Sequence, residues 1–298
     1  MIALRLAPDE GDEGFVQPLA ADELWTAAAV AAGARPARRP PAARAPDAAP
    51  GEWRLVYDGP GIDLGHPRRV VARVAASGER LVEFDDGELY WIAADGGAIE
   101  RVASGGGAAA AVRERALGAP LALALAARGV HLLHASAVVA RGGVIALAAG
   151  SGVGKSTLAA AANRLPALAA RRVADDVLPV RLAGEPLALP HFPQLKLAAA
   201  EAYPSAAPAS VPLAALVELD RGEPGGPPPR LERLSPAAAA LALARATVAA
   251  RLFDPALLAS HLEACAAAAS RLPVARLTYP GGDDRLGEVL AQVVRVTD

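Results

Sequence analysis

A glycine-rich octapeptide carries the clearest chemical signal in the sequence. It consists of Gly150, Ser151, Gly152, Val153, Gly154, Lys155, Ser156 and Thr157. An apolar run (144–149) precedes it and a helix-forming run (158–162) follows. The backbone N–H groups of such a loop, and the positive end of the new helix, bind phosphate. The sequence therefore predicts a P-loop, although Ala149 replaces the first glycine of the Walker A pattern.

Two side chains of this loop have expected roles in binding ATP and a metal. A lysine at the position of Lys155 contacts the β- and γ-phosphates as a point charge, and a hydroxyl at the position of Ser156 binds Mg²⁺. ATP and Mg²⁺ are therefore the expected substrate and cofactor.

Two adjacent acids, Asp175 and Asp176, follow an apolar stretch after the loop helix. If the strand stays extended, their carboxylates point to opposite sides of it. One would then face the metal, for which we favour Asp175. The other would accept the proton of an acceptor hydroxyl, for which we favour Asp176. A pair that only caps a helix or forms a turn is the alternative.

Asp220 is a second candidate for the metal, because it follows the apolar strand 214–219. The next residues are Arg221, Gly222, Glu223 and Pro224, and this composition favours an ordinary turn for Asp220. His134 lies one hairpin before the loop, in the apolar segment 130–139 that we expect to pair with 144–149. It therefore falls near the loop, where it would touch a phosphate or hold a catalytic aspartate, unless its role is purely structural.

The elements around these residues alternate between strands and helices. Short β-like segments separated by turn residues fill 52–102, and strands are expected at 172–180, where two acids break the strand, and at 214–220 and 273–280. Helices are expected at 113–128, 235–249, 255–269 and 286–296. We predict an α/β protein with an N-terminal segment and Pro/Ala/Arg-rich linker (1–51), a small β-rich domain (52–111) and a catalytic domain (112–298).

The bulk composition excludes several classes of protein. The 298 residues include 30 basic and 32 acidic side chains, a balance that does not suit a nucleic-acid-binding protein. One cysteine, Cys265, allows no internal disulfide. No segment has the length and apolarity of a membrane span, and the acids at positions 9 and 10 do not fit a signal peptide. We therefore expect a cytoplasmic protein that binds neither nucleic acid nor membrane.

Taken in order, the segment 132–139 with His134, the loop 150–157 and the segment 173–176 resemble the C-terminal catalytic domain of HPr kinase/phosphorylase. The similarity is closer to the HPr-kinase-related proteins that phosphorylate serines of peptides or proteins. The resemblance implies a fold related to ATP-type phosphoenolpyruvate carboxykinases. It also implies one active site formed by His134, the loop and the aspartate pair. Thr157 departs from the family, which typically has Glu there.

These observations together predict an ATP-dependent, Mg²⁺-requiring kinase that acts on a hydroxyl, with a peptide or protein serine as the expected acceptor. A small-molecule kinase is one alternative. A nucleotide-binding regulatory module with little or no turnover is the other, although such a module would not need both acids. Whether the chain forms a homo-oligomer is left open.

Overall fold

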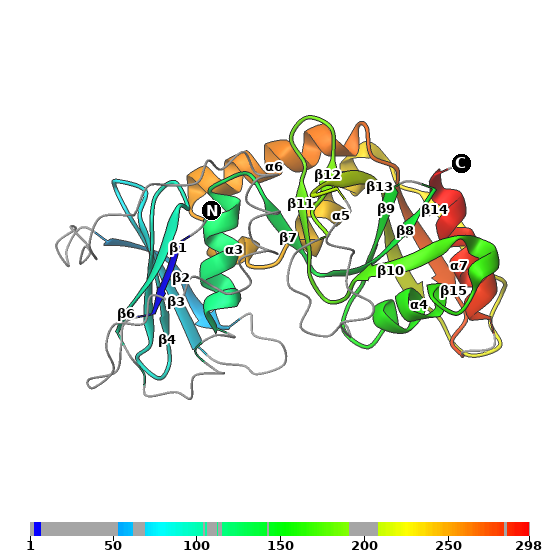
Figure 1. Cartoon of the computed structure of the whole chain (residues 1–298), viewed down its shortest axis with the longest axis horizontal. Coiled ribbons are helices and arrows are strands. Elements are labelled where there is room, and N and C mark those ends of the chain that lie inside the picture. The colour runs from blue at the N-terminus through cyan, green and yellow to red at the C-terminus, as the bar shows by residue number, and fades with distance from the viewer. Residues whose placement is uncertain are drawn as a thin grey trace. The chain divides into compact units, whose positions relative to one another are not determined.

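The computed structural model describes residues 3–6, 53–61, 69–103, 105, 112, 115–141, 143–190, 208–282 and 285–297. The structure is mixed α/β (Figure 1) and divides into two compact units. Unit 1 contains the described residues up to Val130, together with Val248–Ala259. Unit 2 contains His131–Thr247 and the described part of Ser260–Asp298. This division lies beyond the boundary at 111/112 that the sequence suggests, and it makes both units discontinuous.

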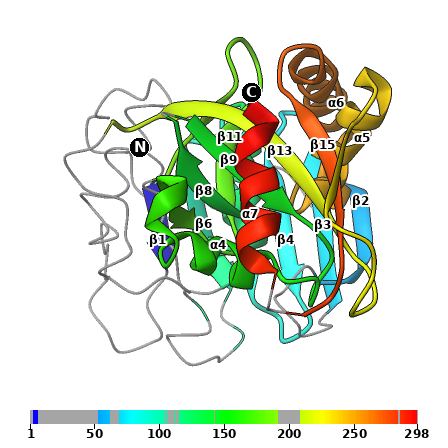
Figure 2. The ribbon, with the colours of Figure 1, turned by 90° about the vertical axis from the view of Figure 1, so that its right-hand side faces the viewer.

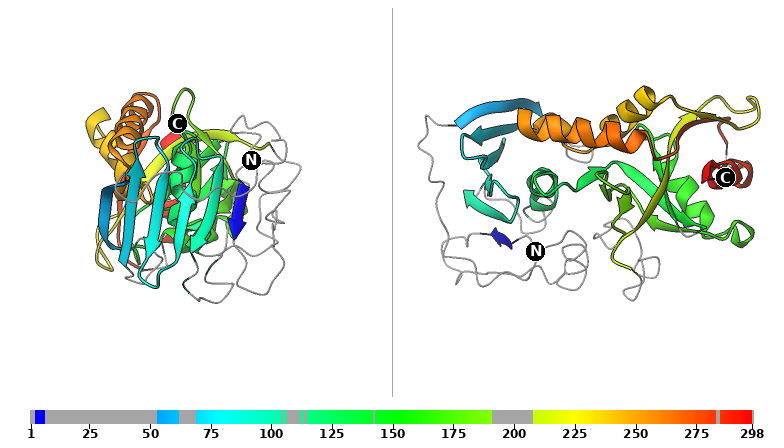
Figure 3. Two further views of the ribbon diagram at one scale, coloured as in Figure 1. Left: turned by 90° about the vertical axis from the view of Figure 1, so that its left-hand side faces the viewer. Right: turned by 90° about the horizontal axis from the view of Figure 1, so that it is seen from above.

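Unit 1 is built on a six-stranded sheet with the order β1-β6-β5-β4-β3-β2, in which only the β1–β6 pairing is parallel. Figure 3 (left) shows β1 and β2 at its two edges. Its strands are β1 Ala3–Leu6, β2 Trp53–Pro60, β3 Arg69–Ala75, β4 Arg80–Phe84, β5 Leu89–Ile92 and β6 Ala98–Ala103. The turns that the sequence predicts from Gly87 and Gly96 join β4 to β5 and β5 to β6, with positive φ at both glycines.

Helix α3 (Ala119–Ala126) covers β5 and β6 of this sheet. All but its first residue are buried. The β5–β6 turn approaches the helix so closely that a Cβ on Gly96 would lie 2.0 Å from the Ala124 carbonyl oxygen. This packing places the helix in unit 1, although the sequence suggests that it begins the catalytic domain.

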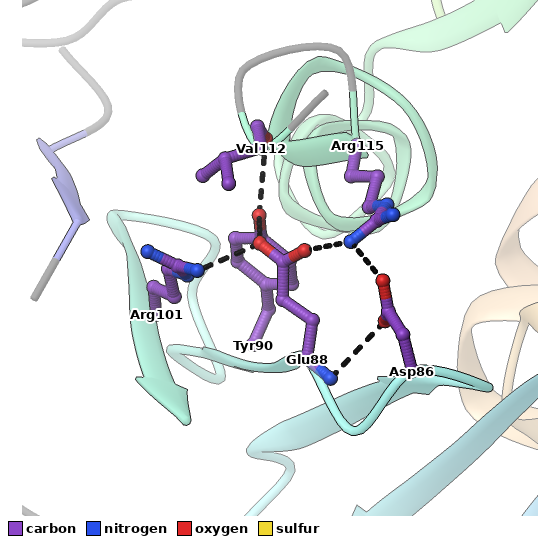
Figure 4. A network of polar contacts seen from close by, with 6 residues as sticks. All are labelled: Asp86, Glu88, Tyr90, Arg101, Val112 and Arg115. Atoms are coloured by element: carbon purple, nitrogen blue, oxygen red, sulfur yellow. Dashed lines mark hydrogen bonds and ion pairs between the residues drawn. The ribbon is translucent and has the colours of Figure 1, made fainter. Parts of the chain in front are cut away.

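A buried charged network lies inside unit 1 (Figure 4). Glu88 is fully buried and forms ion pairs with Arg101, at 3.1 Å, and with Arg115. Arg115 also pairs with Asp86 at 2.6 Å, and the Tyr90 hydroxyl donates to Glu88. Burial, the largest cause, raises the pKa of Tyr90, and the adjacent Glu88 carboxylate raises it further, so the phenol keeps its proton. The two arginines therefore compensate the charge of Glu88, which would be unfavourable in an apolar interior without a partner.

The segment Val248–Ala259 also belongs to unit 1, and a buried ion pair joins it to the sheet. Asp254 lies 2.8 Å from Arg80 of β4, and both side chains are buried. The other carboxylate oxygen of Asp254 accepts hydrogen bonds from the N–H groups of Ala256 and Leu257, in the first turn of α6 (Pro255–Ala269). Asp254 therefore caps this helix while it fixes the segment to the sheet.

Unit 2 is built on a nine-stranded mixed sheet. The order is β10-β8-β9-β13-β12-β11-β7, with β15 pairing both β13 and β14. Strands β9, β13 and β15 are parallel neighbours. The strands are β7 His131–Leu133, β8 Ala135–Ala140, β9 Gly143–Ala148, β10 Ala170–Ala174, β11 Leu178–Arg181, β12 Leu187–Ala188, β13 Val211–Arg221, β14 Arg230–Arg233 and β15 Val274–Tyr279.

Both faces of this sheet are covered, which explains why β9 is an uninterrupted apolar run. Val144, Ala146 and Ala148 pack into one buried cluster with residues of α5 (Pro236–Ala246) and α6. Ile145 and Leu147 pack into a second cluster with residues of α4 (Lys155–Ala162) and α7 (Leu286–Val294). Figure 2 shows α4 and α7 in front of the strands. The alternation along β9 therefore divides the core into two layers.

The helices after residue 234 follow the sequence pattern closely. The residues that the sequence assigns to the second of the late helices are those of α6, and α5 begins after Ser235, whose hydroxyl accepts from the Ala238 N–H. Short 3-10 turns lie at Pro166–Leu168, Ala250–Leu252 and Arg295–Thr297. Within the described ranges, no helix is both long and apolar enough to cross a lipid bilayer.

A buried histidine pair in unit 2 predicts that stability falls in acid. The rings of His131 and His261 lie 4.4 Å apart, and both residues are buried. Burial, with His261 as a smaller cause, lowers the pKa of His131 to about 4, and burial also lowers the pKa of His261. An unfolded chain binds these protons near pH 6.5, whereas the folded chain does not. Stability is therefore present above about pH 6.5 and is lost as the pH falls toward 4.

Urea unfolding of the full chain at pH 8 and pH 5 measures this effect. Each histidine whose pKa is lowered can reduce the free energy of unfolding by up to about 1.4 kcal/mol per pH unit. We expect His131→Leu to lose less stability between the two pH values than the wild type does. An equal loss in both proteins would assign the acid sensitivity to other groups.

Candidate functional site

The predicted phosphate loop lies between the end of β9 and the start of α4. Gly150, Ser151 and Gly152 are exposed, and the backbone is left-handed at Gly152 (φ 79°) and Gly154 (φ 109°). Side chains with a Cβ rarely adopt these values, so both glycines are needed for the turn. The loop thus presents its backbone to solvent at the edge of the sheet where β9 ends.

The orientation of the loop depends on how α4 packs. The buried residues Leu158, Ala159 and Ala162 join the cluster shared with α7 and the sheet. The helix therefore has a fixed axis, and its first turn directly follows the loop. The first N–H groups of a helix have no partner within the helix and carry partial positive charge. The free N–H groups and their partial positive charge would both stabilise a negative group at the loop.

Lys155 lies at the first position of α4, and its side chain is buried. Its Nζ donates to the carbonyl oxygens of Ala149 (2.9 Å) and Gly150 (3.1 Å). The same atom lies 3.1 Å from Nε2 of His134. The ammonium group is therefore folded against the loop and touches one further residue that the sequence singles out.

His134 lies at a break between two strands. The single strand expected at 130–139 was wrong, because β7 ends at Leu133 and β8 begins at Ala135. β8 pairs β9 as expected, whereas β7 pairs β11. The His134 N–H donates to the Ala246 carbonyl at 2.7 Å, beside an isolated antiparallel bridge between Leu133 and Thr247. The break leaves the imidazole about one-third exposed beside the loop.

The strand expected at 172–180 is broken at its two acids, so the aspartate pair does not lie on an extended strand. β10 ends at Ala174, before both acids, and Asp176 has a left-handed backbone with φ 80°. The Asp176 carboxylate lies 3.6 Å from Nδ1 of His134. The two acids do face different partners, but the turn at Asp176 produces this separation.

Asp175 faces the interior of unit 2. Its Oδ1 accepts from the Ser136 hydroxyl at 2.7 Å, and its Oδ2 accepts from Arg172 at 3.1 Å. All three side chains are buried. A metal would have to compete with these two donors for the carboxylate of Asp175. The Asp176 carboxylate instead faces His134.

A cavity of about 610 Å³ lies beside the loop within unit 2. His134, Gly150, Asp220, Arg245 and Arg276 are among the residues that line it. The turn predicted for Asp220 was wrong, because this residue belongs to β13, the parallel neighbour of β9. Parallel strands end at the same edge of a sheet, where α/β proteins bind ligands, so Asp220 lies beside the loop.

Sequence reasoning missed the two arginines of this cavity. Arg276 pairs with Glu218 across β15 and β13 at 3.1 Å, and Arg245 belongs to the last turn of α5. Only the register of the strands and the packing of α5 place the two arginines at the cavity.

For Asp220 the sequence did contain a signal. An apolar strand that is followed by an acid indicates a residue at the end of a strand, beside the loop.

The donor atoms present suit a magnesium ion that is held partly by phosphate. Across the described residues, no group of three or more His, Cys, Asp or Glu side chains is arranged to hold a metal. Mg²⁺ commonly takes one or two protein oxygens and completes its shell with water and substrate phosphates. The hydroxyl-bearing residue Ser156 is exposed in the first turn of α4, next to the loop.

Comparison with known proteins gives little further information. No protein-family model matches the chain, and no curated protein matches it. One similar solved structure is the Hpr(Ser) kinase/phosphatase from Coxiella burnetii, with 13% sequence identity and a TM-score of 0.29. The match covers 55% of this chain and 90% of that chain.

Proposed function

We propose that this chain binds Mg·ATP at the loop 150–157 and transfers the γ-phosphoryl group to a hydroxyl acceptor. One observation carries the proposal. Asp176, His134 and Lys155 form a continuous polar chain, with separations of 3.6 Å and 3.1 Å, that ends at the glycine-rich loop. A carboxylate can accept the proton of an acceptor hydroxyl, and an ammonium group can neutralise phosphate charge. Phosphoryl transfer uses both groups, and here the imidazole lies between them.

Each residue has a distinct role in this proposal. Lys155 neutralises charge on the phosphates, and the loop N–H groups orient them. Asp176 accepts the proton as the acceptor oxygen forms its bond to phosphorus and the bond from ADP to the γ-phosphorus breaks. His134 orients Asp176 and holds it beside Lys155. Ser156 would hold Mg²⁺, which supplies positive charge to the phosphate oxygens when bound.

The acceptor we favour is a serine of a peptide or protein, and this choice rests on the resemblance of His134, the loop and the aspartate pair to the HPr-kinase-related proteins. A small-molecule acceptor is the second candidate. The cavity beside the loop favours it, because about 610 Å³ falls within the range of sites for small ligands.

Incubation with γ-labelled ATP and Mg²⁺ tests the proposal. The full chain is supplied separately with a library of serine-containing peptides, with a mixture of small alcohols, and with buffer alone. We expect stable label on peptides, and label on an alcohol would select the second candidate. ATP that binds but releases no phosphate in any arm would favour a regulatory nucleotide-binding module. Absence of ATP binding would exclude the proposal.

Asp176→Asn tests the proposed base. We expect Mg·ATP affinity to stay within about threefold of the wild type, while phosphoryl transfer falls by roughly 10²–10⁴-fold, the scale of a lost general base. Single-turnover transfer and titration calorimetry measure the two quantities separately. Asp85→Asn, the same change at an exposed turn of unit 1, is the matched control. Transfer at the wild-type rate in Asp176→Asn would remove this residue from the chemistry.

A further inference from the structure

The hydroxyl of a buried tyrosine reaches the phosphate loop from the last strand of unit 2. Tyr279 ends β15, and only about 5% of it is exposed. Its hydroxyl donates to the carbonyl oxygen of Val153 at 2.7 Å. Val153 immediately precedes Gly154, the residue at the N-terminus of α4. A residue far away in the sequence thus holds one peptide group of the loop.

This contact determines the direction of one N–H group. The structure contains no cis peptide bonds among its described residues, and in a planar trans peptide the C=O and N–H point in opposite directions. The Val153 carbonyl points toward the Tyr279 hydroxyl. The N–H of Gly154, which belongs to the same peptide group, must therefore point away from Tyr279. This peptide group is one of those on the loop side of the helix N-terminus, where anions are stabilised.

We propose that Tyr279 is a positioning residue for phosphate binding, because its hydrogen bond holds the Val153–Gly154 peptide with the Gly154 N–H directed toward the phosphates. The inference rests on the proposed ATP site and adds a residue that the Walker A pattern does not contain. Its ligand class is a nucleoside triphosphate, recognised here through its phosphates alone.

The surroundings of Tyr279 keep this hydrogen bond in place. Its carbonyl accepts from the Gly222 N–H at 2.8 Å, and its ring packs into the cluster that also contains residues of α4 and α7. Burial raises the pKa of the phenol, so the hydroxyl stays a donor at neutral pH. A Cβ on Gly154 would lie 3.3 Å from the Tyr279 oxygen, which leaves little room for a side chain there. The position of the Tyr279 hydroxyl therefore favours a glycine at position 154.

Tyr279→Phe in the full chain tests the proposal, because it removes only the donor. We expect affinity for ATP and for inorganic tripolyphosphate to fall by the same factor, about 3- to 10-fold, which is the scale of one lost hydrogen bond. In a transfer assay KM for ATP should rise by that factor, while kcat changes less. Tyr57→Phe is the matched control, because the Tyr57 hydroxyl also donates to a backbone carbonyl, that of Pro60, at an exposed site in unit 1.

The outcomes separate this inference from the proposed function. A wild-type chain that binds ATP, with a Tyr279→Phe variant that binds it equally well, overturns the role of Tyr279 alone. A wild-type chain that binds neither ATP nor tripolyphosphate overturns both. Amide hydrogen exchange of the wild type provides a test that needs no variant. We expect ATP to protect the Gly154 amide, and an unchanged exchange rate at Gly154 beside protected neighbours would contradict the proposal.

Discussion

Lys155→Ala is expected to reduce phosphoryl transfer by about 10²–10³-fold, the loss typical of removing one preorganised electrostatic group from an active site. Lys155 combines a buried side chain with an ammonium group at the loop and His134. Alanine removes the charge that would offset the phosphates. It also breaks the polar chain that links His134 to the loop, so affinity for ATP should fall as well. Titration calorimetry and single-turnover transfer measure the two effects.

Arg164→Ala is the matched control for this experiment. Arg164 follows the other end of α4, is exposed, and removal of its side chain deletes the same unit of charge. We expect activity and ATP affinity close to those of the wild type. If Lys155→Ala were fully active, the loop would have no part in the chemistry. If both variants lost activity equally, the effect would come from the net charge of the protein rather than from the site.

Glu88→Gln is expected to destabilise unit 1 by about 3–5 kcal/mol, the cost of leaving buried charge without its counter-ion. Glu88 is the shared partner of Arg101 and Arg115, and it is fully buried (Figure 4). Glutamine keeps the size of the side chain but cannot neutralise either guanidinium. Chemical denaturation of the full chain, followed by the fluorescence of the tryptophans of β2 and β5, reports the change.

Glu83→Gln on the neighbouring strand provides the comparison. Glu83 pairs with Arg73 at 2.7 Å, but both side chains are more than one-third exposed. Exposed pairs contribute about 0–1 kcal/mol, so we expect a small effect. Similar losses for Glu83→Gln and Glu88→Gln would show that burial does not determine the strength of this network.

The sequence alone predicted the local structure around the loop because local rules govern it. The apolar run of β9, the glycines at 152 and 154 and the alanine-rich α4 each have a strong preference for the conformation that they adopt. Helices α5 and α6 were similarly predictable. The assignments of Lys155, Ser156, Asp175 and Asp176 to particular roles stay predictions.

Contacts between distant residues decided the rest. His134 lies beside the loop because the chain leaves the ladder of β7 and enters that of β8 at this residue, and strand pairing is a long-range choice that propensity does not fix. The left-handed backbone of Asp176 is another such case, because a non-glycine residue adopts it only where the surrounding structure compensates its cost.

The register of the parallel strands placed the remaining groups. Asp220 continues β13 because the strand pairs with β15 as far as Arg221, although its composition favours a turn. The same pairing brings Tyr279 to the end of the sheet from which its hydroxyl reaches Val153. The sequence by itself therefore determined which residues could bind phosphate. The tertiary structure determined which acids, histidine and tyrosine lie beside them, because burial, strand pairing and long-range hydrogen bonds join distant segments. The hydrogen bond from Tyr279 to Val153 spans more than 100 residues.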